Sequence, residues 1–89
     1  MLYPYVTLGD GTEVLHTGIH EENGMETVEV HFERPIENGF MTARFVLPTY
    51  ELIERDNVSD EELKFLIKLL ECNAHLIYKY AKCGGAVNA

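Results

Sequence analysis

Four side chains in the first half of the chain are of the types that bind divalent metals or transfer protons. His16 belongs to one predicted strand, and Glu29, His31 and Glu33 belong to another. If these strands are neighbours in a sheet, two imidazoles and two carboxylates can meet on its open face, to hold a metal or serve as acid and base. A plainer interpretation is the polar solvent face of a half-buried sheet. Because no single segment has the ligand spacing of a closed zinc site, we expect no metal and no cofactor.

The other groups capable of chemistry are few. His20 and His75 are expected at the surface, in a polar loop and on a helix. Cys72 and His75, one helical turn apart, could share a metal with a partner chain, but Cys72 is more simply a small apolar residue in an interface. The sequence contains no HExxH, CxxC, GxSxG or glycine-rich phosphate-binding motif. We therefore expect a protein that is not an enzyme.

The last third of the chain predicts one long helix, Ser59–Cys83, because it contains no Pro or Gly. Ser59 and Glu62 form a capping box, in which the Ser59 hydroxyl accepts from an early backbone N–H and Glu62 reaches back to the cap. Gly84-Gly85 predicts a left-handed stop, and residues 86–89 a frayed tail.

This helix is apolar on two sides, roughly 145° apart. The first stripe comprises Leu63, Leu66, Ile67, Leu70, Ala74, Ile77, Tyr78 and Ala81; the second comprises Phe65, Leu69, Cys72, Leu76, Tyr80 and Cys83. One sheet can cover only one stripe, so the second predicts packing against the same helix of another copy, in a homodimer. The alternative is that the N-terminal strand or the segment Thr49–Glu54 covers the second stripe within one chain.

The first half of the chain reads as short strands separated by three turns that contain glycine, at residues 9–11, 23–24 and 38–39. Alternation with period two is clearest in Thr27–Glu33 and Phe40–Leu47, which predict a hairpin. Tyr3–Leu8 and Thr12–Thr17 predict two earlier strands, and Pro4 places the first of them at an edge.

Two further segments are expected outside the sheet. Ile19–Gly24 reads as a polar loop, and Thr49–Glu54 as a short helical turn after Pro48. The prediction is therefore an α+β fold, a four-stranded antiparallel meander packed on one long C-terminal helix (β-β-β-β-α), in a single domain of residues 1–85.

Charge is distributed unevenly along the chain. The net charge is −8, and residues 1–62 carry fourteen Asp and Glu against three Arg. Such acidity argues against nucleic-acid binding, whereas an acidic sheet face with Glu13, Glu29 and Glu33 could bind a basic protein. Four lysines on the helix form a solvated ridge. With no apolar run of membrane-spanning length and no secretory signal, we expect no membrane association and a cytoplasmic location.

Three segments carry a resemblance: TLGDGTEV, VEVHFERPIENGF and NAHLIYKYA. Through them the chain resembles small proteins of intestinal Gram-positive bacteria, some of which accompany mobile elements. The resemblance implies no activity and assigns no residue a role.

Three hypotheses of function follow. The first is a non-enzymatic accessory or adaptor domain that self-associates through the second helical stripe. The second is a small-molecule or metal-binding protein that uses the His16, Glu29, His31 and Glu33 cluster. The third is an antitoxin-like or inhibitor-like subunit whose acidic surface covers a basic partner.

Overall fold

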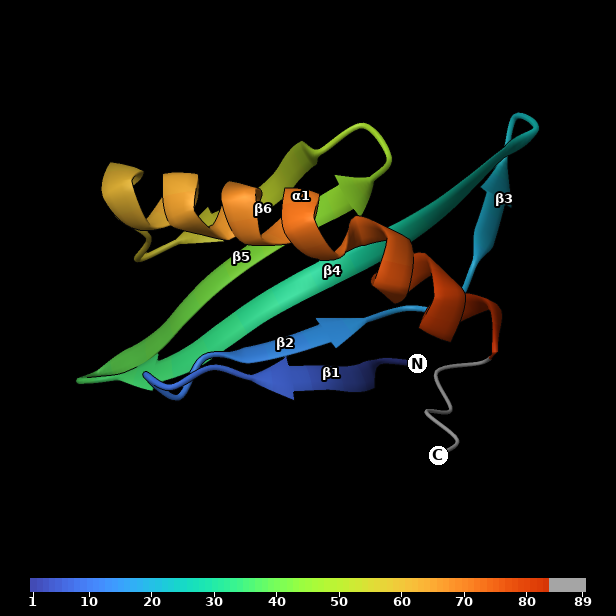
Figure 1. Cartoon of the computed structure of the whole chain (residues 1–89). Coiled ribbons are helices and arrows are strands. Elements are labelled where there is room, and N and C mark those ends of the chain that lie inside the picture. Colours follow the sequence, from blue (N-terminus) through green and yellow to red (C-terminus); the bar gives the residue numbers. More distant parts are fainter. Residues whose placement is uncertain (84–89) are drawn as a thin grey trace.

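The computed structural model describes residues 1–83, which form an antiparallel sheet and one C-terminal helix. The elements are β1 (Tyr3–Thr7), β2 (Glu13–His16), β3 (His20–Glu22), β4 (Met25–Ile36), β5 (Gly39–Leu47), β6 (Glu51–Asp56) and α1 (Asp60–Lys82). The sheet has the order β1-β2-β4-β5-β6, and β3 pairs with the start of β4. The predicted α+β class is confirmed. Figure 1 shows α1 lying across one face of the sheet, with its last turns towards β3.

The predicted hairpin forms from β4 and β5, and because β6 pairs with β5 it lies at the centre of the sheet and not at its edge. Its register runs from Val28 opposite Leu47 to Ile36 opposite Gly39. Asn38 in the turn has a φ of 67°, the left-handed conformation that Asn tolerates better than most residues. Every second residue of the hairpin faces the helix, and these residues form most of the core: Val28, Val30, Phe32, Met41, Ala43, Phe45 and Leu47.

The prediction of four strands is wrong in two places. The segment Thr49–Glu54 is not a helical turn, because Glu51–Asp56 forms β6 and pairs with β5, with Leu52 opposite Phe45. The expected loop Ile19–Gly24 contains β3, whose His20 pairs with Thr27. Backbone pairing with a neighbouring long strand stabilises both short segments, although neither has a clear apolar alternation.

Helix α1 begins as predicted, but its capping box is only half formed. The Ser59 hydroxyl accepts a hydrogen bond of 3.1 Å from the Glu62 backbone N–H. The Glu62 carboxylate does not reach back, because both of its oxygens accept from Arg34 on β4, at 2.6 and 3.2 Å. The predicted stop at Gly84-Gly85 and the tail of residues 86–89 lie outside the described residues.

Arg34 connects three parts of the chain. Besides Glu62, its guanidinium donates to Asp10 Oδ2 and Thr12 Oγ1, each at 3.0 Å, in the turn between β1 and β2. The Glu62 carboxylate raises the pKa of Arg34 further. Hydrogen bonds from Thr12, followed by the charge of Arg34, lower the pKa of Asp10. This cluster holds the start of α1 against the sheet.

The first helical stripe faces the sheet, as predicted. Leu66, Leu70, Ile77 and Ala81 are buried, and Leu63, Ile67, Ala74 and Tyr78 pack around them, half-buried. At its far end the helix is held by the Tyr78 hydroxyl, which donates to the Glu26 carbonyl at 3.0 Å. Within residues 1–83, no helix is both long and apolar enough to cross a membrane.

Candidate functional site

The four predicted metal or acid–base residues do not form one cluster, because His16 lies on the opposite face of the sheet from the others. His16 pairs with Val30 and shares the helix-covered face with it, whereas Glu29, His31 and Glu33 point to the open face. The expectation that both histidines face outward is therefore wrong. The reason is strand register. His16 and Val14 are two residues apart and so lie on the same face of the sheet, and Val14 is buried on that face opposite Phe32.

His16 is a core residue of the described structure. Its side chain is fully buried, and its Nδ1 lies 2.8 Å from the Thr17 carbonyl oxygen. The rings of Tyr3 and Tyr5 lie beside it, with centroids 5.8 and 6.5 Å away. Nε2 is buried with no hydrogen-bond partner among residues 1–83. These contacts assign His16 to the packing between β1, β2 and the core.

The open face of the sheet carries a short polar network around Glu29. His31 Nε2 lies 3.0 Å from Glu29 Oε1, and Arg44 Nη1 lies 4.0 Å from the same oxygen. Arg44 Nε also lies 2.8 Å from Glu54 Oε1. His31 is buried, whereas Glu29, Arg44 and Glu54 are partly exposed to solvent. The network therefore lies directly on the sheet surface.

Negative charge dominates this open face. The register places seven carboxylates there: Glu13, Glu22, Glu29, Glu33, Glu51, Glu54 and Asp56. Glu13 lies directly opposite Glu33 on the neighbouring strand, an arrangement of like charges that costs stability. The strand register places Glu13 on this face, beside Glu33.

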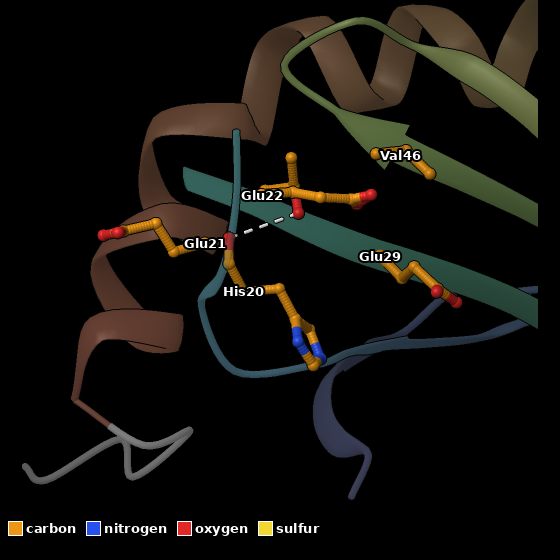
Figure 2. A pocket seen from close by; sticks show the side chains of 6 residues that line it. His20, Glu21, Glu22, Glu29 and Val46 are labelled. Carbon is orange, nitrogen blue, oxygen red and sulfur yellow. Dashed lines mark hydrogen bonds between the residues drawn. The ribbon is translucent and has the colours of Figure 1, made fainter. Parts of the chain in front are cut away.

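A hollow of about 310 Å³ lies at the end of the open face, where β3 pairs with the start of β4. His20, Glu22, Thr27, Glu29 and Val46 contribute to its lining. Figure 2 shows the Glu22 and Glu29 carboxylates over β4, with Glu21 pointing away from them. Among residues 1–83, no three His, Cys, Asp or Glu side chains are arranged to hold a metal ion.

A second hollow, of about 400 Å³, is an apolar groove between edge strand β1 and helix α1. Its lining is uncharged and comprises Tyr5, Val6, Leu8, Leu69, Asn73 and Tyr80. The Tyr5 hydroxyl donates a hydrogen bond of 2.7 Å to Asn73 Oδ1, and the Tyr5 and Tyr80 rings lie 5.8 Å apart. Burial, followed by the neighbouring Tyr80, raises the pKa of Tyr5.

The groove shows where the second helical stripe lies. Leu69, Leu76 and Tyr80 are half-buried, and Leu69 and Tyr80 face β1 across the groove. Phe65 is 55% exposed, and Cys72 and Cys83 are exposed free thiols. The N-terminal strand thus covers one side of the stripe within the chain, which is part of the alternative raised from the sequence. Among residues 1–83, Phe65 and the two thiols on the other side remain exposed.

The residues on the β1 side of this groove could not be identified from the sequence. A bulge between Pro4 and Val6 puts Tyr5 and Val6 on the same face of the sheet, towards α1. Strict alternation would place them on opposite faces. The only available signal was the imperfect alternation of Tyr3, Pro4 and Tyr5.

Comparisons with protein-family models, with curated proteins and with solved structures find no match to this chain.

Proposed function

We propose that this chain is a non-enzymatic protein-interaction domain that forms a homodimer through its β1–α1 side, in an accessory or adaptor role in the cytoplasm. The supporting observations are the apolar groove between β1 and α1 and the exposed side chain of Phe65, one helical turn before the groove-lining Leu69. Phe65 and Leu69 are four residues apart and are therefore neighbours on the helix surface. A large aromatic side chain exposed beside an apolar groove is typical of an interface anchor.

The spacing of the second stripe suits pairing with another helix. Its members stand at positions 65, 69, 72, 76, 80 and 83, in steps of three and four residues. Such steps form the seam of paired helices, where each side chain fits between side chains of the partner. Covering Phe65 fully would contribute up to about 1.5–3 kcal/mol per chain, reduced because Phe65 is already partly covered.

Charge favours this side of the molecule over the others for contact between two copies. Each copy has a net charge of −8, so two copies repel each other through most of their surfaces. The groove-lining residues, Phe65 and Cys72 are all uncharged. Depletion of charge at the centre of the contact is the usual composition of a dimer interface.

A pair of matched variants tests the homodimer. Phe65→Glu places a charge in the proposed interface, whereas Phe40→Glu changes the same residue type at nearly the same exposure, 55% against 59%. Phe40 lies on β5 and belongs to the open face of the sheet, which is the face opposite to the groove. We expect Phe65→Glu to be folded and monomeric by light scattering, and Phe40→Glu to remain dimeric. Equal behaviour of the two folded variants would contradict the proposed interface.

Substitution of Leu69 or Leu76 is less informative. Both side chains are half-buried within the chain, and Leu69 packs against the core. A glutamate at either position would destabilise the monomer as well as any dimer. Substitution of Phe65 avoids this ambiguity, because its side chain is 55% exposed within one chain.

The acidic open face supports a second candidate function, that of a subunit covering a basic partner. Seven carboxylates share this face with Arg44, His20 and His31. A basic protein bound there would relieve the repulsion between Glu13 and Glu33. A Glu13→Gln and Glu33→Gln variant should then lose salt-sensitive binding of a lysine-rich peptide. Absence of salt-sensitive binding by the unmodified protein would reject this candidate.

The hollow beside β3 is where the small-molecule hypothesis would place a ligand. It contains His20 and Glu29, with His31 in contact with Glu29, but not His16. Chemical-shift changes of His20 on addition of Zn²⁺, lost in Glu29→Gln, would favour this hypothesis over the interaction domain.

A further inference from the structure

Strands β1 and β6, at the two ends of the strand order, differ in how they are protected from other strands. Edge strand β6, Glu51–Asp56, carries four charged residues among six. Edge strand β1, Tyr3–Thr7, carries none. Charged side chains on an edge strand prevent pairing with another chain, because the added strand would bury them beside its backbone. The β6 edge is protected in this way, and the β1 edge is not.

Other devices do not account for the difference between the edges. Both β1 and β6 contain a register shift, between Pro4 and Val6 in one and opposite Arg44 and Phe45 in the other. Pro4 lacks a backbone N–H, which removes one donor at the start of β1. The residues Tyr5–Thr7 retain theirs. Pro4 thus blocks one position of β1, whereas the charged residues of β6 extend along most of that strand.

The β1 edge also adjoins the groove beneath α1. Tyr5 and Val6 belong to β1 and line that groove, and Val6 is 44% exposed. A strand added to β1 would obtain backbone hydrogen bonds from the edge. Its alternate side chains would also reach the apolar surface formed by Val6, Leu69 and Tyr80. Binding of an added strand commonly combines these two sources of affinity.

We infer that β1 pairs antiparallel with β1 of a second copy, so that two sheets join into one across a two-fold axis. This inference rests on the proposed homodimer and specifies its geometry. The axis places both copies of α1 on the same face of the joined sheet. The second helical stripes then extend towards each other over the two β1 strands. A lone extended peptide would occupy the edge but leave Phe65 and Cys72 uncovered, whereas a second copy brings its own helix.

Hydrogen–deuterium exchange on the full chain tests the inference, because both edges are measured in one sample. At high micromolar concentration we expect protection of those backbone amides of Tyr5–Thr7 that point away from β2. Dilution to low nanomolar concentration should increase their exchange. The amides of β6 serve as the internal control and should exchange equally at both concentrations. Light scattering on the same samples reports the mass.

A matched pair of lysine variants provides a second readout. Val6 on β1 and Ile53 on β6 are both β-branched and similarly exposed, at 44% and 40%. We expect Val6→Lys to raise the dimer dissociation constant by about tenfold or more, equivalent to about 1.4 kcal/mol. Ile53→Lys should leave it nearly unchanged. Circular dichroism confirms that each variant is folded.

The outcomes separate the two proposals. A chain that is monomeric at every concentration overturns both the homodimer and the strand pairing. A dimer whose β1 amides exchange equally at high and low concentration, and which tolerates Val6→Lys, retains the homodimer and overturns the pairing of β1. Protection of the β6 amides instead of β1 would also overturn it.

Discussion

The Tyr5 hydroxyl donates a 2.7 Å hydrogen bond to Oδ1 of Asn73, which ties edge strand β1 to the middle of helix α1. The two residues are 68 positions apart in the sequence. Asn73 Nδ2 in turn donates to the Leu69 carbonyl at 2.8 Å, so the amide is held in one orientation. This contact sets the width of the groove and the position of the second helical stripe above β1.

Removal of this contact should loosen β1 from the helix. We expect Tyr5→Phe to lower the free energy of unfolding by about 0.5–1.5 kcal/mol, the usual contribution of one hydrogen bond. In a domain of this size, that corresponds to a midpoint shift of about 4–8 °C per kcal/mol. Tyr5→Phe, Asn73→Ala and the double variant should form a cycle with less than additive losses, measured at constant chain concentration. If the losses of the two single variants add up to the loss of the double variant, the Tyr5–Asn73 contact contributes nothing to the free energy of unfolding.

Alkaline pH should weaken the same region. Burial raises the pKa of Tyr5 and of Tyr78 above the ordinary value of 10.0. Below pH 10 both hydroxyls are protonated in the folded and unfolded states, and their contribution is complete. Above it the unfolded chain loses these protons first, so the free energy of unfolding falls until the folded pKa is passed. Urea denaturation across this range should show a smaller decline in a Tyr5→Phe and Tyr78→Phe variant.

The Arg34 cluster should contribute more to stability than the ion pairs of the open face. The side chains of Arg34 and Glu62 are only 21% and 23% exposed, against 37% and 45% for Arg44 and Glu54. We expect Arg34→Ala to cost about 1.5–3 kcal/mol, as for hydrogen bonds to charged groups. Arg44→Ala should cost under about 1 kcal/mol. Equal losses in thermal denaturation would contradict the assigned role of Arg34.

The parts of the fold that could be predicted are those where local signals and burial agree. Ser59 caps the start of α1, and the first apolar stripe faces the sheet, because one helical face is buried along its whole length. The β4–β5 hairpin could be predicted for the same reason. Strand β6 could not, because an edge strand is paired on one side only. Its bulge at Ile53 also breaks the alternation, which leaves Leu52 as its one partly buried apolar residue.

The site was harder to predict because it depends on register and distance. In β2, each face carries one apolar residue: Val14 lies beside His16, and Leu15 beside Glu13. Only the pairing of Val14 with Phe32 decides which face is buried. The groove likewise depends on the approach of β1 to α1, which no local pattern encodes. The place of Phe65 on the second helical stripe, by contrast, could be predicted directly from helical spacing.

His16 should act as a packing residue and not as a metal ligand. Because its side chain is fully buried, His16→Ala should cost about 2–5 kcal/mol through the cavity it leaves. His16→Leu should recover much of this loss, since it restores volume and removes the unpaired Nε2. Both effects should be the same with and without a chelator in thermal denaturation. A loss that appears only when zinc is present would indicate a ligand.

The most direct test of the homodimer is the mass of the unmodified chain in solution. Light scattering coupled to size-exclusion chromatography should give twice the chain mass of 10.1 kDa at high micromolar concentration. The value should fall towards one chain mass on dilution. High salt should favour the dimer or leave it unchanged, because the proposed interface is uncharged and salt screens the repulsion between two copies of net charge −8. A mass of one chain at every concentration would contradict the account.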